Sequence, residues 1–511
     1  MAGFLSSTTT ISQLSVPVLS ACAAALLLCY LLIGSWVNHR KLRQFRGPFW
    51  ASCSRSWIFW HECNARLNKA QFDAIKQYGK ALLGSPCRIG PTLLITDDAD
   101  VVRHMNAPAS QWRRSGWYDG MRLDPRLDSV FSTRDEKHHA ELRAKESGGY
   151  NGRDITTLEP DIDSRINDVL ALISDRYSNR KTLDFALISR FFTLDVLSTI
   201  AFGRPFGFME ANDDLWDYVK STSSAMFLLT LVVNHSSVRW LFHSRIMQAL
   251  GAPKVTDKTG MGPMLAFARK AVAERFGSKP VVKQDMLGHF INKGLSQTQC
   301  EAEAALQIIA GSDSTTTILQ CTLFLLVGTP AAYAKLKDEL DHSEKAGTVS
   351  GSDIIQYTET QKLQYLQAVI WEGIRLFPPL FGLKAKLAPK GGDTINGVYY
   401  PEGTEMAICD AALSKNPAVF GSDAHLFRPE RWIEADAATK VKYRQTVDSI
   451  FGSGRFLCLG RHIAMMELHK TIAELVRHFD WAMADPMRGI DTHAHSVHLQ
   501  SNMNLVAIPR T

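Results

Sequence analysis

The first 38 residues of this chain contain no charged side chain, which constrains their placement more tightly than any other feature of the sequence. Within them, residues 16–37 form a predominantly apolar run that, as a helix, would reach roughly 33 Å and cross a hydrocarbon core of about 30 Å. The alternative is a cleaved signal peptide, which requires a basic segment before an apolar run of only about 7–15 residues. Here the basic residues, from His39 to Arg46, follow the run. We therefore predict a membrane anchor over residues 1–38.

The basic segment also predicts the topology of the chain. Because positively charged flanks tend to remain in the cytosol, the residues after the anchor are expected there. Gly47 and Pro48 should end the helix, so residues 39–60 are assigned to a basic flank and hinge. In the cytosol, the sequon that begins at Asn234 would not meet the glycosylation machinery. The nine cysteines show no CxxC pair and are expected to be reduced thiols.

The remaining residues, 61–511, predict one large α+β domain that is mostly helical. A chain of 511 residues, 45% hydrophobic and 21% charged, has ample apolar material for a buried core. The net charge of +6 lies largely in the basic flank, so we expect no nucleic-acid partner. Apolar spacing predicts helices over much of 155–345 and 459–479, and breakers and β-formers predict strands at 81–89, at 92–96 and among turns in 376–412.

The first of four segments that carry chemistry is a cysteine in a glycine-rich loop. Cys458 lies within residues 451–460, just before a predicted helix, with glycines at 452, 454 and 460. Backbone N–H groups and a helix N-terminus lower the pKa of a thiol and suit the thiolate to bind a metal. Glycines let the backbone approach a flat partner without Cβ clashes. Taken alone, a single cysteine of this kind is better explained as a buried structural cysteine on a glycine turn.

The second segment places an acid beside hydroxyl residues in an apolar helix predicted over 301–327. These residues are Asp313, Ser314 and Thr315, after Gly311. A buried Asp is costly unless it is paired or functional, and such residues weaken the helix ladder enough to admit water. An acid next to an alcohol is what proton delivery to a bound ligand requires. The alternative is a kinked core helix whose Asp meets a basic partner.

The third and fourth segments predict a buried ionic network. Glu372 and Arg375 are three residues apart on a predicted helix, a spacing that allows a salt bridge. Arg431, before Trp432, can complete a Glu–Arg–Arg network with them. A Glu–x–x–Arg match such as the third segment arises by chance once or twice in a chain of this size. The fourth segment, taken by itself, is also compatible with an exposed loop of mixed charge.

The order and spacing of these four segments resemble those of the cytochrome P450 family, and the resemblance spans essentially the whole chain. It implies a cytochrome P450 fold behind an N-terminal transmembrane helix, with 61–511 as the haem domain. Cys458 would be the iron ligand, Asp313 and Ser314 the proton relay, and Glu372, Arg375 and Arg431 structural. Ser314 stands where Thr is usual, so Thr315 is a possible substitute.

The resemblance also implies how the haem carboxylates are held. His139 and Arg143 resemble the aromatic residue and the Arg, four apart, that contact the propionates, with His139 at a position usually occupied by Trp. Phe456 stands where Arg or His is usual, two residues before Cys458. Phe cannot pair with a carboxylate, so Arg455, Arg143 and Lys386 are expected to carry that charge. Within the family, the sequence around Cys458 and around residues 112–118 resembles enzymes of fungal secondary metabolism.

By this resemblance, the chain would bind haem b and insert one oxygen atom from O2 into a C–H bond. Electrons would come from NADPH through a separate reductase, because the chain carries no GxGxxG fingerprint or flavin domain. The expected localisation is the endoplasmic reticulum membrane, single-pass, with a cytosolic catalytic domain. The expected pocket segments, 112–121, 225–231 and 380–383, are largely apolar and suit a lipophilic ligand such as a terpenoid, alkaloid or polyketide.

Three other functions remain open from the sequence. An isomerase, dehydratase or peroxygenase of the same fold would need no external electrons, but such enzymes often lack the acid–alcohol pair. A membrane haemoprotein that carries electrons or senses a ligand would favour two strong axial ligands and no proton relay. A haem-free tethered protein with a decayed site is disfavoured by Cys458 and Glu372.

Overall fold

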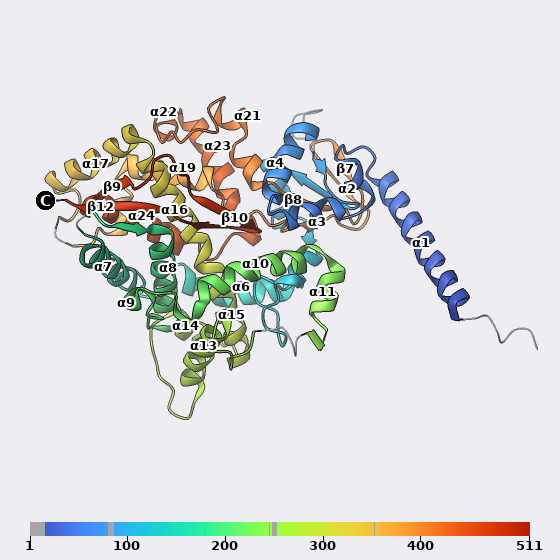
Figure 1. The fold of residues 1–511 in the computed structure, drawn as a ribbon, viewed down its shortest axis with the longest axis horizontal. Coiled ribbons are helices and arrows are strands. Elements are labelled where there is room, and N and C mark those ends of the chain that lie inside the picture. Colours follow the sequence, from blue (N-terminus) through green and yellow to red (C-terminus); the bar gives the residue numbers. More distant parts are fainter. Residues whose placement is uncertain are drawn as a thin grey trace, which may run out of the picture.

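The computed structural model describes residues 16–79, 86–152, 154–178, 180–244, 246–247, 253–351 and 353–510. The fold is mostly helical with small sheets, as predicted (Figure 1). The largest sheet lies beside the N-terminal helices, and most of the remaining helices gather on the other side of the molecule.

The N-terminal part begins with a long helix that projects from the body (Figure 1). This helix, α1, covers the predicted anchor helix and continues into the basic flank, where His39, Arg40 and Lys41 occupy its last turn. The elements of this part are α1 (Val16–Lys41), α2 (Phe49–Cys53), α3 (Ser56–Cys63), α4 (Leu67–Tyr78), β1 (Cys87–Arg88), β2 (Leu93–Thr96), α5 (Ala99–Asn106), β3 (Arg113–Arg114) and the 3-10 helix η2 (Gly116–Met121).

The largest sheet joins this part to a distant segment of the chain. Its strand order is β1-β2-β8-β5-β3, with β5 (Lys386–Leu387) and β8 (Glu405–Ile408). β2 pairs in parallel with β8, so that Leu94 lies opposite Met406, while β3 pairs antiparallel with β5. The first strand predicted here, 81–89, is observed only as β1, and residues 80–85 lie outside the described part of the chain.

The central helices form the bulk of the core. Val169, Ile173, Phe191 and Leu194 are among the apolar residues that are buried at the predicted spacings. The elements are α6 (Glu136–Tyr150), α7 (Leu158–Tyr177), β4 (Thr182–Asp184), α8 (Phe185–Phe202), α9 (Phe208–Ala211), η3 (Leu215–Asp217), α10 (Tyr218–Asn234), α11 (Ser236–Phe242), α13 (Met261–Phe276), α14 (Met286–Asn292), α15 (Gln297–Gly311), α16 (Asp313–Val327), α17 (Pro330–Lys345), α18 (Tyr357–Thr360) and α19 (Gln364–Leu376).

The helix predicted over 301–327 is two helices, because α15 ends at Gly311 and α16 begins at Asp313. At this break, side-chain hydroxyls bond to carbonyls one turn earlier. Ser312 Oγ donates to the Ile308 carbonyl at 3.0 Å, and Ser314 Oγ donates to the Ala310 carbonyl at 2.8 Å. Hydroxyls that compete for these carbonyls bend helices. The break therefore falls at the weak point of the ladder that the residue types predict.

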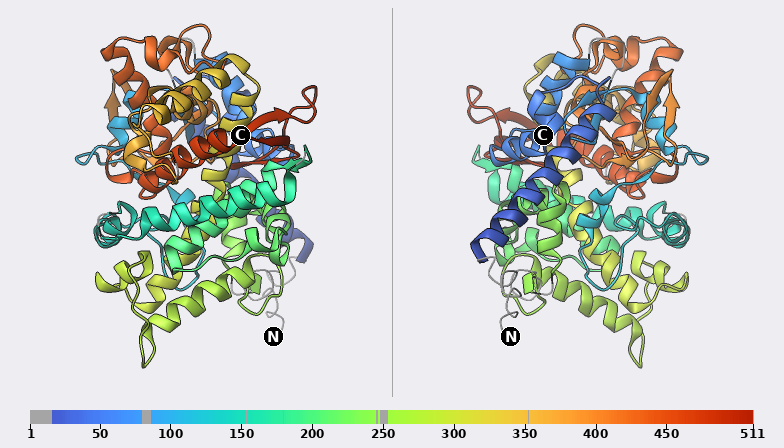
Figure 2. Two further views of the ribbon diagram at one scale, coloured as in Figure 1. Left: turned by 90° about the vertical axis from the view of Figure 1, so that its left-hand side faces the viewer. Right: turned by 90° about the vertical axis from the view of Figure 1, so that its right-hand side faces the viewer.

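The C-terminal part returns along the core to the middle of the chain. β12 (Asn504–Pro509) pairs antiparallel with both β4 and β9 (Phe479–Met483), and Figure 2 shows the red C-terminal strands against the teal segment that contains α7, β4 and α8. The elements are β6 (Asp393–Ile395), β7 (Val398–Tyr400), α20 (Asp410–Ser414), α21 (Pro417–Phe420), α22 (Arg431–Glu434), α23 (Ala437–Asp448), η4 (Ser449–Phe451), η5 (Gly454–Phe456), α24 (Arg461–His478), β9 (Phe479–Met483), β10 (Asp491–His495), β11 (Val497–Ser501) and β12 (Asn504–Pro509).

Among the described residues, α8 is long and apolar enough to cross a membrane by length and composition. Inside the protein, however, 94% of that helix is buried, because it packs against α7, α15 and α16. Two bent pairs meet the same test only if each counts as one span: Leu215–Asn234 with α11, and Gln297–Val327 with α17. Burial thus identifies α8 as a core helix.

Candidate active site

The glycine-rich loop turns tightly before α24 and sets the position of Cys458. The Cys458 N–H donates to the Phe451 carbonyl at 2.7 Å, closing the loop on itself. Gly452 has φ +83°, and a Cβ there would lie 2.6 Å from the Phe456 carbonyl oxygen. Only glycine adopts this conformation without strain and leaves room for the closure. Cys458 is thereby held three residues before the first residue of α24.

Part of the Cys458 side chain is accessible to solvent, but many protein atoms lie close to its sulfur. Burial raises the pKa of its thiol, while the N–H groups of Gly460 and Arg461 and the charge of Arg143 act in the opposite direction. The next residue, Leu459, packs against a cluster that contains Leu142 of α6 and Leu306 of α15. The loop therefore faces two helices that the sequence predicted to flank a haem. A bound metal ion would reverse the effect of burial on the thiol.

A second accessible surface lies on α15, directly before the helix break. Ala310 is exposed, although most of the residues around it in α15 and α16 are buried. Ser314, one turn later, is half-buried, and its hydroxyl bonds to the Ala310 carbonyl. Thr315 is only 4% exposed, and its hydroxyl lies 3.4 Å from the Gly311 carbonyl. Of the two hydroxyls, the one on Ser314 therefore lies on the same accessible side of the helix as Ala310.

Asp313 is buried beside a basic partner on α8. Its Oδ1 lies 3.3 Å from Arg190 Nε, and both side chains are almost fully buried. Burial raises the pKa of the Asp313 carboxyl, and the Arg190 charge acts in the opposite direction. The sequence suggested two alternatives, a kinked helix whose Asp meets a basic partner and an acid beside an accessible hydroxyl. The structure contains both features, because Asp313 is paired with Arg190 and the Ser314 hydroxyl lies on the accessible face. Arg190 was not identified from the sequence, because its partner lies on a helix distant in the chain.

Buried cations surround the Phe456 ring. Lys386 Nζ lies 3.0 Å from the ring centroid, and the guanidinium carbon of Arg114 lies 4.9 Å from it. Arg114 Nη1 donates to the carbonyls of Val130 and Thr133, at 2.9 and 2.7 Å. In contrast, Lys386 Nζ and Arg114 Nε are buried without a hydrogen-bond partner in the described structure. Burial lowers the pKa of the Lys386 ammonium well below its usual value, and the nearby positive charge of Arg114 lowers it further.

Unpaired buried cations of this kind fit an anionic ligand, because an uncompensated buried charge is costly. The two carboxylates of a haem beside Cys458 would supply the missing partners. His139 lies next to the same ring, 5.3 Å between ring centroids, and burial and the surrounding cations lower its pKa to about 3. His139 is therefore neutral and packs against Phe456. The residues present thus fit the haem implied by the sequence.

Arg455 and Arg114 both lie over the Phe456 ring, with their guanidinium carbons 4.8 and 4.9 Å from its centroid. The Arg455 guanidinium also donates to the backbone carbonyls of Ala107, Pro108, Ser110 and Trp112. Its Nε lies 3.2 Å from Glu136, so Arg455 also anchors the loop after α5. Arg114 was not among the carboxylate contacts predicted from the sequence. The signal for Arg114 was present in the quoted segment 112–118, but only the pairing of β3 with β5 shows that it sits beside Lys386.

The predicted Glu–Arg–Arg network is assembled and fully buried. Glu372 accepts two hydrogen bonds from Arg375, at 2.6 and 2.8 Å, and one from Arg431 Nε, at 2.9 Å. The Trp432 indole N–H and the Arg428 backbone N–H complete its five donors, at 2.8 and 3.0 Å. The remaining guanidinium N–H groups bond to carbonyls between residues 414 and 426. The network thereby fixes the segment that leads to the cysteine loop.

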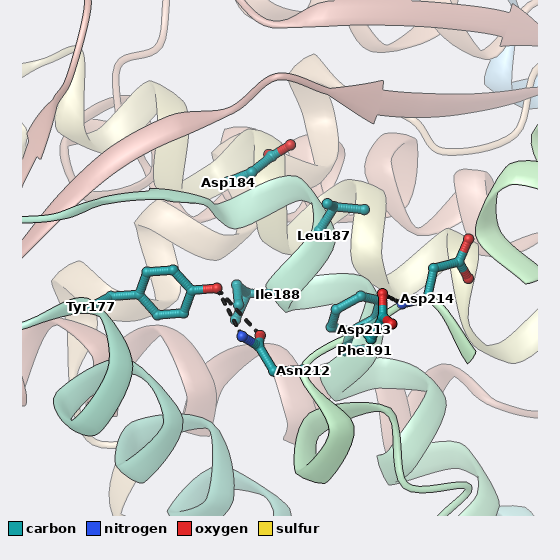
Figure 3. A pocket seen from close by; sticks show the side chains of 8 residues that line it. All are labelled: Tyr177, Asp184, Leu187, Ile188, Phe191, Asn212, Asp213 and Asp214. Carbon is teal, nitrogen blue, oxygen red and sulfur yellow. Dashed lines mark hydrogen bonds between the residues drawn. The ribbon is translucent and has the colours of Figure 1, made fainter. Parts of the chain in front are cut away.

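A separate cavity of about 150 Å³ lies between α7, α8 and the turn after α9 (Figure 3). None of the predicted site residues lines it. Tyr177 and Asn212 bond to each other across it, and the carboxylates of Asp184 and Asp214 accept backbone N–H groups. The cavity is therefore separate from the surfaces around Cys458 and Ala310.

Comparison with known proteins identifies the family. The sequence profile of the cytochrome P450 family matches residues 72–505. The chain belongs to this family. It is 37% identical over 481 residues to cytochrome P450 monooxygenase ABA1 of Pyricularia oryzae, covering 93% of this chain and 94% of that protein. It is 34% identical to aba1 of Botryotinia fuckeliana, over 90% and 91% of the two chains, and 27% identical to gsfF of Penicillium aethiopicum, over 96% and 98%.

The relatives define the class of enzyme more closely. Each is named a cytochrome P450 monooxygenase, and each matches nearly the full length of the chain. The protein is thus a cytochrome P450 monooxygenase, and membership in the family implies a haem cofactor and O2.

Glu372→Gln should destabilise the fold, because a neutral amide leaves Arg375 buried without a countercharge and leaves Arg431 with Asp423 alone. We expect a loss of about 3–5 kcal/mol in the free energy of unfolding, with low haem content. The same substitution at Glu434, an exposed partner of Arg428, should change stability by less than about 0.5 kcal/mol. Urea unfolding and haem content of the purified variants measure both effects. Equal stability of the two variants would contradict a central role for the network.

Proposed function

We propose that this chain is a haem-thiolate monooxygenase that inserts one oxygen atom from O2 into a C–H bond of a lipophilic small molecule. Electrons would come from NADPH through a separate reductase, and the reaction would be a tailoring step in secondary-metabolite biosynthesis. The observation that carries the proposal is that the accessible thiol of Cys458 follows, by two residues, the Phe456 ring over which the buried cations Lys386 and Arg114 lie. The sulfur would bind the iron of a haem, and the cations would pair with the carboxylates of the same haem.

Different residues would bind different parts of the haem. Cys458 would ligate the iron, while Lys386, Arg114 and Arg143 would neutralise the carboxylates. Neutral His139 would pack against Phe456 at the same edge. Arg455 would act indirectly, by fixing the loop that precedes β3. When bound, the haem supplies the activation of O2, and the thiolate ligand favours O–O cleavage.

Asp313 and Ser314 would deliver protons to the distal side. Asp313 is an acid kept in the interior by Arg190, and exchange between this pair and water would let it carry a proton. Ser314 presents its hydroxyl on the accessible side of the broken helix. This arrangement favours a monooxygenase over an isomerase or dehydratase of the same fold, and over a haemoprotein that only transfers electrons, because neither needs distal proton delivery.

We also propose that α1 anchors the protein in the endoplasmic reticulum membrane, with the catalytic domain in the cytosol. The side chains of Ile33, Trp36 and Val37 are exposed on α1. Trp50 of α2, Trp60 of α3 and Trp240 of α11 are 71%, 67% and 77% exposed. α2 packs against α1 and α3 packs against both α2 and α10, so these indoles belong to neighbouring elements. Exposed Trp beside an apolar helix with a basic end is typical of a membrane interface.

The carbon monoxide difference spectrum of the reduced protein tests the ligand. We expect the red-shifted thiolate band in the wild type and its loss in Cys458→Ala, because the Ala side chain cannot ligate iron. Cys63→Ala, which removes an exposed thiol on α3, should keep the band. A normal band in Cys458→Ala, or a wild type that binds no haem when haem is supplied, would overturn the proposal.

Substitutions at the helix break test proton delivery. With a reductase and any substrate that the wild type converts, Asp313→Asn should lower product formation by about 10²-fold while the carbon monoxide spectrum stays intact. Ser314→Ala should raise the peroxide formed per NADPH consumed. Thr315→Ala is the matched control, since its hydroxyl is buried, and should change this ratio little. The assignment fails if Thr315→Ala uncouples the reaction as strongly as Ser314→Ala.

Vesicle flotation tests the membrane interface. Removal of residues 1–37 should weaken binding to phosphatidylcholine vesicles but leave a residual association through the exposed indoles. Adding Trp50→Ser, Trp60→Ser and Trp240→Ser should abolish this residual binding, because each substitution removes apolar surface from the interface. Met487→Ser changes an even more exposed apolar side chain elsewhere and serves as the control. Unchanged residual binding after the three Trp substitutions would exclude this surface.

A further inference from the structure

Two carboxyl groups are buried against each other between α6 and α15. Glu146 and Glu303 are each 0% exposed, and their side chains lie within hydrogen-bonding reach of one another. Leu142 and Leu306, one turn away on the two helices, belong to one apolar cluster. Two ionised carboxylates in such a place would repel each other, and burial makes each charge costly. The pair therefore requires a proton.

The surroundings of the four oxygens show which carboxyl carries this proton. Glu303 Oε1 accepts from the Val130 backbone N–H at 2.9 Å and from Gln299 Nε2 at 2.8 Å. Glu303 Oε2 and both oxygens of Glu146 have no donor in the described structure. A carboxyl with two donors is stabilised as the anion, whereas a buried carboxyl without a donor is stable only when protonated. This asymmetry places the proton on Glu146, whose O–H then donates to Glu303 Oε2.

The electrostatics of the pair favour the same assignment. Burial raises the pKa of the Glu146 carboxyl well above its usual value, and the charge of Glu303 raises it further, although Arg143 acts in the opposite direction. Burial raises the pKa of Glu303 only to about 7, because the bonds from Val130 and Gln299 lower it. At neutral pH the pair therefore keeps at least one proton, and Glu146 holds it.

Arg143 is the cation whose pairing depends on this proton. It lies three residues before Glu146 on α6, a spacing that allows a salt bridge. Within the part of the chain that the structure describes, however, Arg143 forms no ion pair. Its guanidinium interacts electrostatically with both Cys458 and Glu146, so it lies between the proposed haem site and the buried pair. A neutral Glu146 offers no countercharge, and Arg143 is left available to an external anion.

We propose that Glu303 is a positioning residue that, by sharing one proton with Glu146, keeps Arg143 free to pair with a haem carboxylate. An ionised Glu146 would compete for the Arg143 guanidinium from within the same helix. The inference rests on the proposed function, since it needs a haem carboxylate beside Arg143. It gives the buried pair a role in how firmly the cofactor is held.

Conservative substitutions at the two positions have opposite expected effects. Glu303→Gln keeps an oxygen for its two donors and turns an N–H₂ group toward Glu146, which stabilises Glu146 as a carboxylate that can bind Arg143. Glu146→Gln instead supplies a neutral donor to Glu303 and reproduces the protonated state. The double variant leaves no charge to compete for Arg143, so it should reverse the effect of Glu303→Gln. A pair that serves packing alone would not recover in the double variant.

The rate at which the full-length haem protein loses haem to excess apomyoglobin at neutral pH tests the role of Glu303. Glu303→Gln should raise this rate about tenfold, the factor expected when one charge-assisted hydrogen bond to the haem is lost. Glu146→Gln and the double variant should stay within about twofold of the wild type, because both leave Arg143 free. Glu141→Gln changes an exposed acid on the same helix and should not alter the rate.

Infrared difference spectra test the shared proton independently of haem binding. The wild-type spectrum minus that of Glu146→Gln should contain the C=O stretching band of a protonated carboxyl, because the substitution removes the acid that holds the proton. The wild-type spectrum minus that of Glu303→Gln should contain the same band, since Glu146 would then be ionised. Subtracting the Glu141→Gln spectrum should leave no such band. Absence of the band from the first difference spectrum would overturn the inference.

The outcomes distinguish this inference from the proposed function. An unchanged haem-loss rate in Glu303→Gln, with the thiolate spectrum intact, would overturn the role of Glu303 alone. Faster loss in the double variant as well would show loosened packing and would also overturn it. If Glu303→Gln takes up no haem, recovery of uptake in the double variant supports the inference, and no recovery overturns it. A wild type that binds no haem would remove the proposed function, and this inference with it.

Discussion

The carboxylate of Glu372 organises the part of the chain on which the cysteine loop depends. Five donors surround its two oxygens, and the two guanidinium groups that pair with it bond onward to carbonyls of the 414–426 segment. Removing three charges from water costs several kcal/mol for each ion, and only a complete set of partners offsets this cost. Such a network tolerates one arrangement of the chain, because any displaced carbonyl leaves a buried donor unsatisfied. The segment from Phe427 to Trp432 is therefore fixed before any cofactor is considered.

The cations beside Phe456 show the opposite condition. Arg375 and Arg431 have their counterion within the protein, whereas Lys386 Nζ and Arg114 Nε lack a partner among the described residues. The structure thus contains one ionic cluster whose charges are paired within the protein and one in which two basic nitrogen atoms have no hydrogen-bond partner among the described residues. This contrast is more informative than the presence of basic residues, because it separates charges that are paired within the fold from charges that an anionic ligand can still pair with. It also explains how Phe can replace a basic residue at 456, since its ring is a surface over which Lys386 and Arg114 gather.

The sequence predicted most of what depends on local pattern or on spacing along the chain. Apolar periodicity located the core helices, and glycine placement located the turn before Cys458. The sequence predicted short strands less well. β1, β3 and β5 have two residues each, which is too few to show the alternation of apolar and polar residues that identifies a strand. The proximity of Arg114 to Lys386 results from the pairing of β3 with β5, which joins residues far apart in sequence. Arg190 was missed for the same reason, since its partner Asp313 comes from a distant helix.

The break at Ser312 follows a physical logic that sequence periodicity cannot express. Polar residues lie there at positions where apolar residues would give a continuous helix. Ser314 of α16 bonds back to the Ala310 carbonyl of α15, and Thr316 bonds back to the Ser312 carbonyl, so side-chain hydroxyls link the two helices across the break. Asn234 shows the same use of polar groups at a helix end, because it ends α10 while its side chain bonds to Glu62 of α3 and Trp117 of η2. A large apolar core supports both places, so a few directional bonds determine the local geometry there.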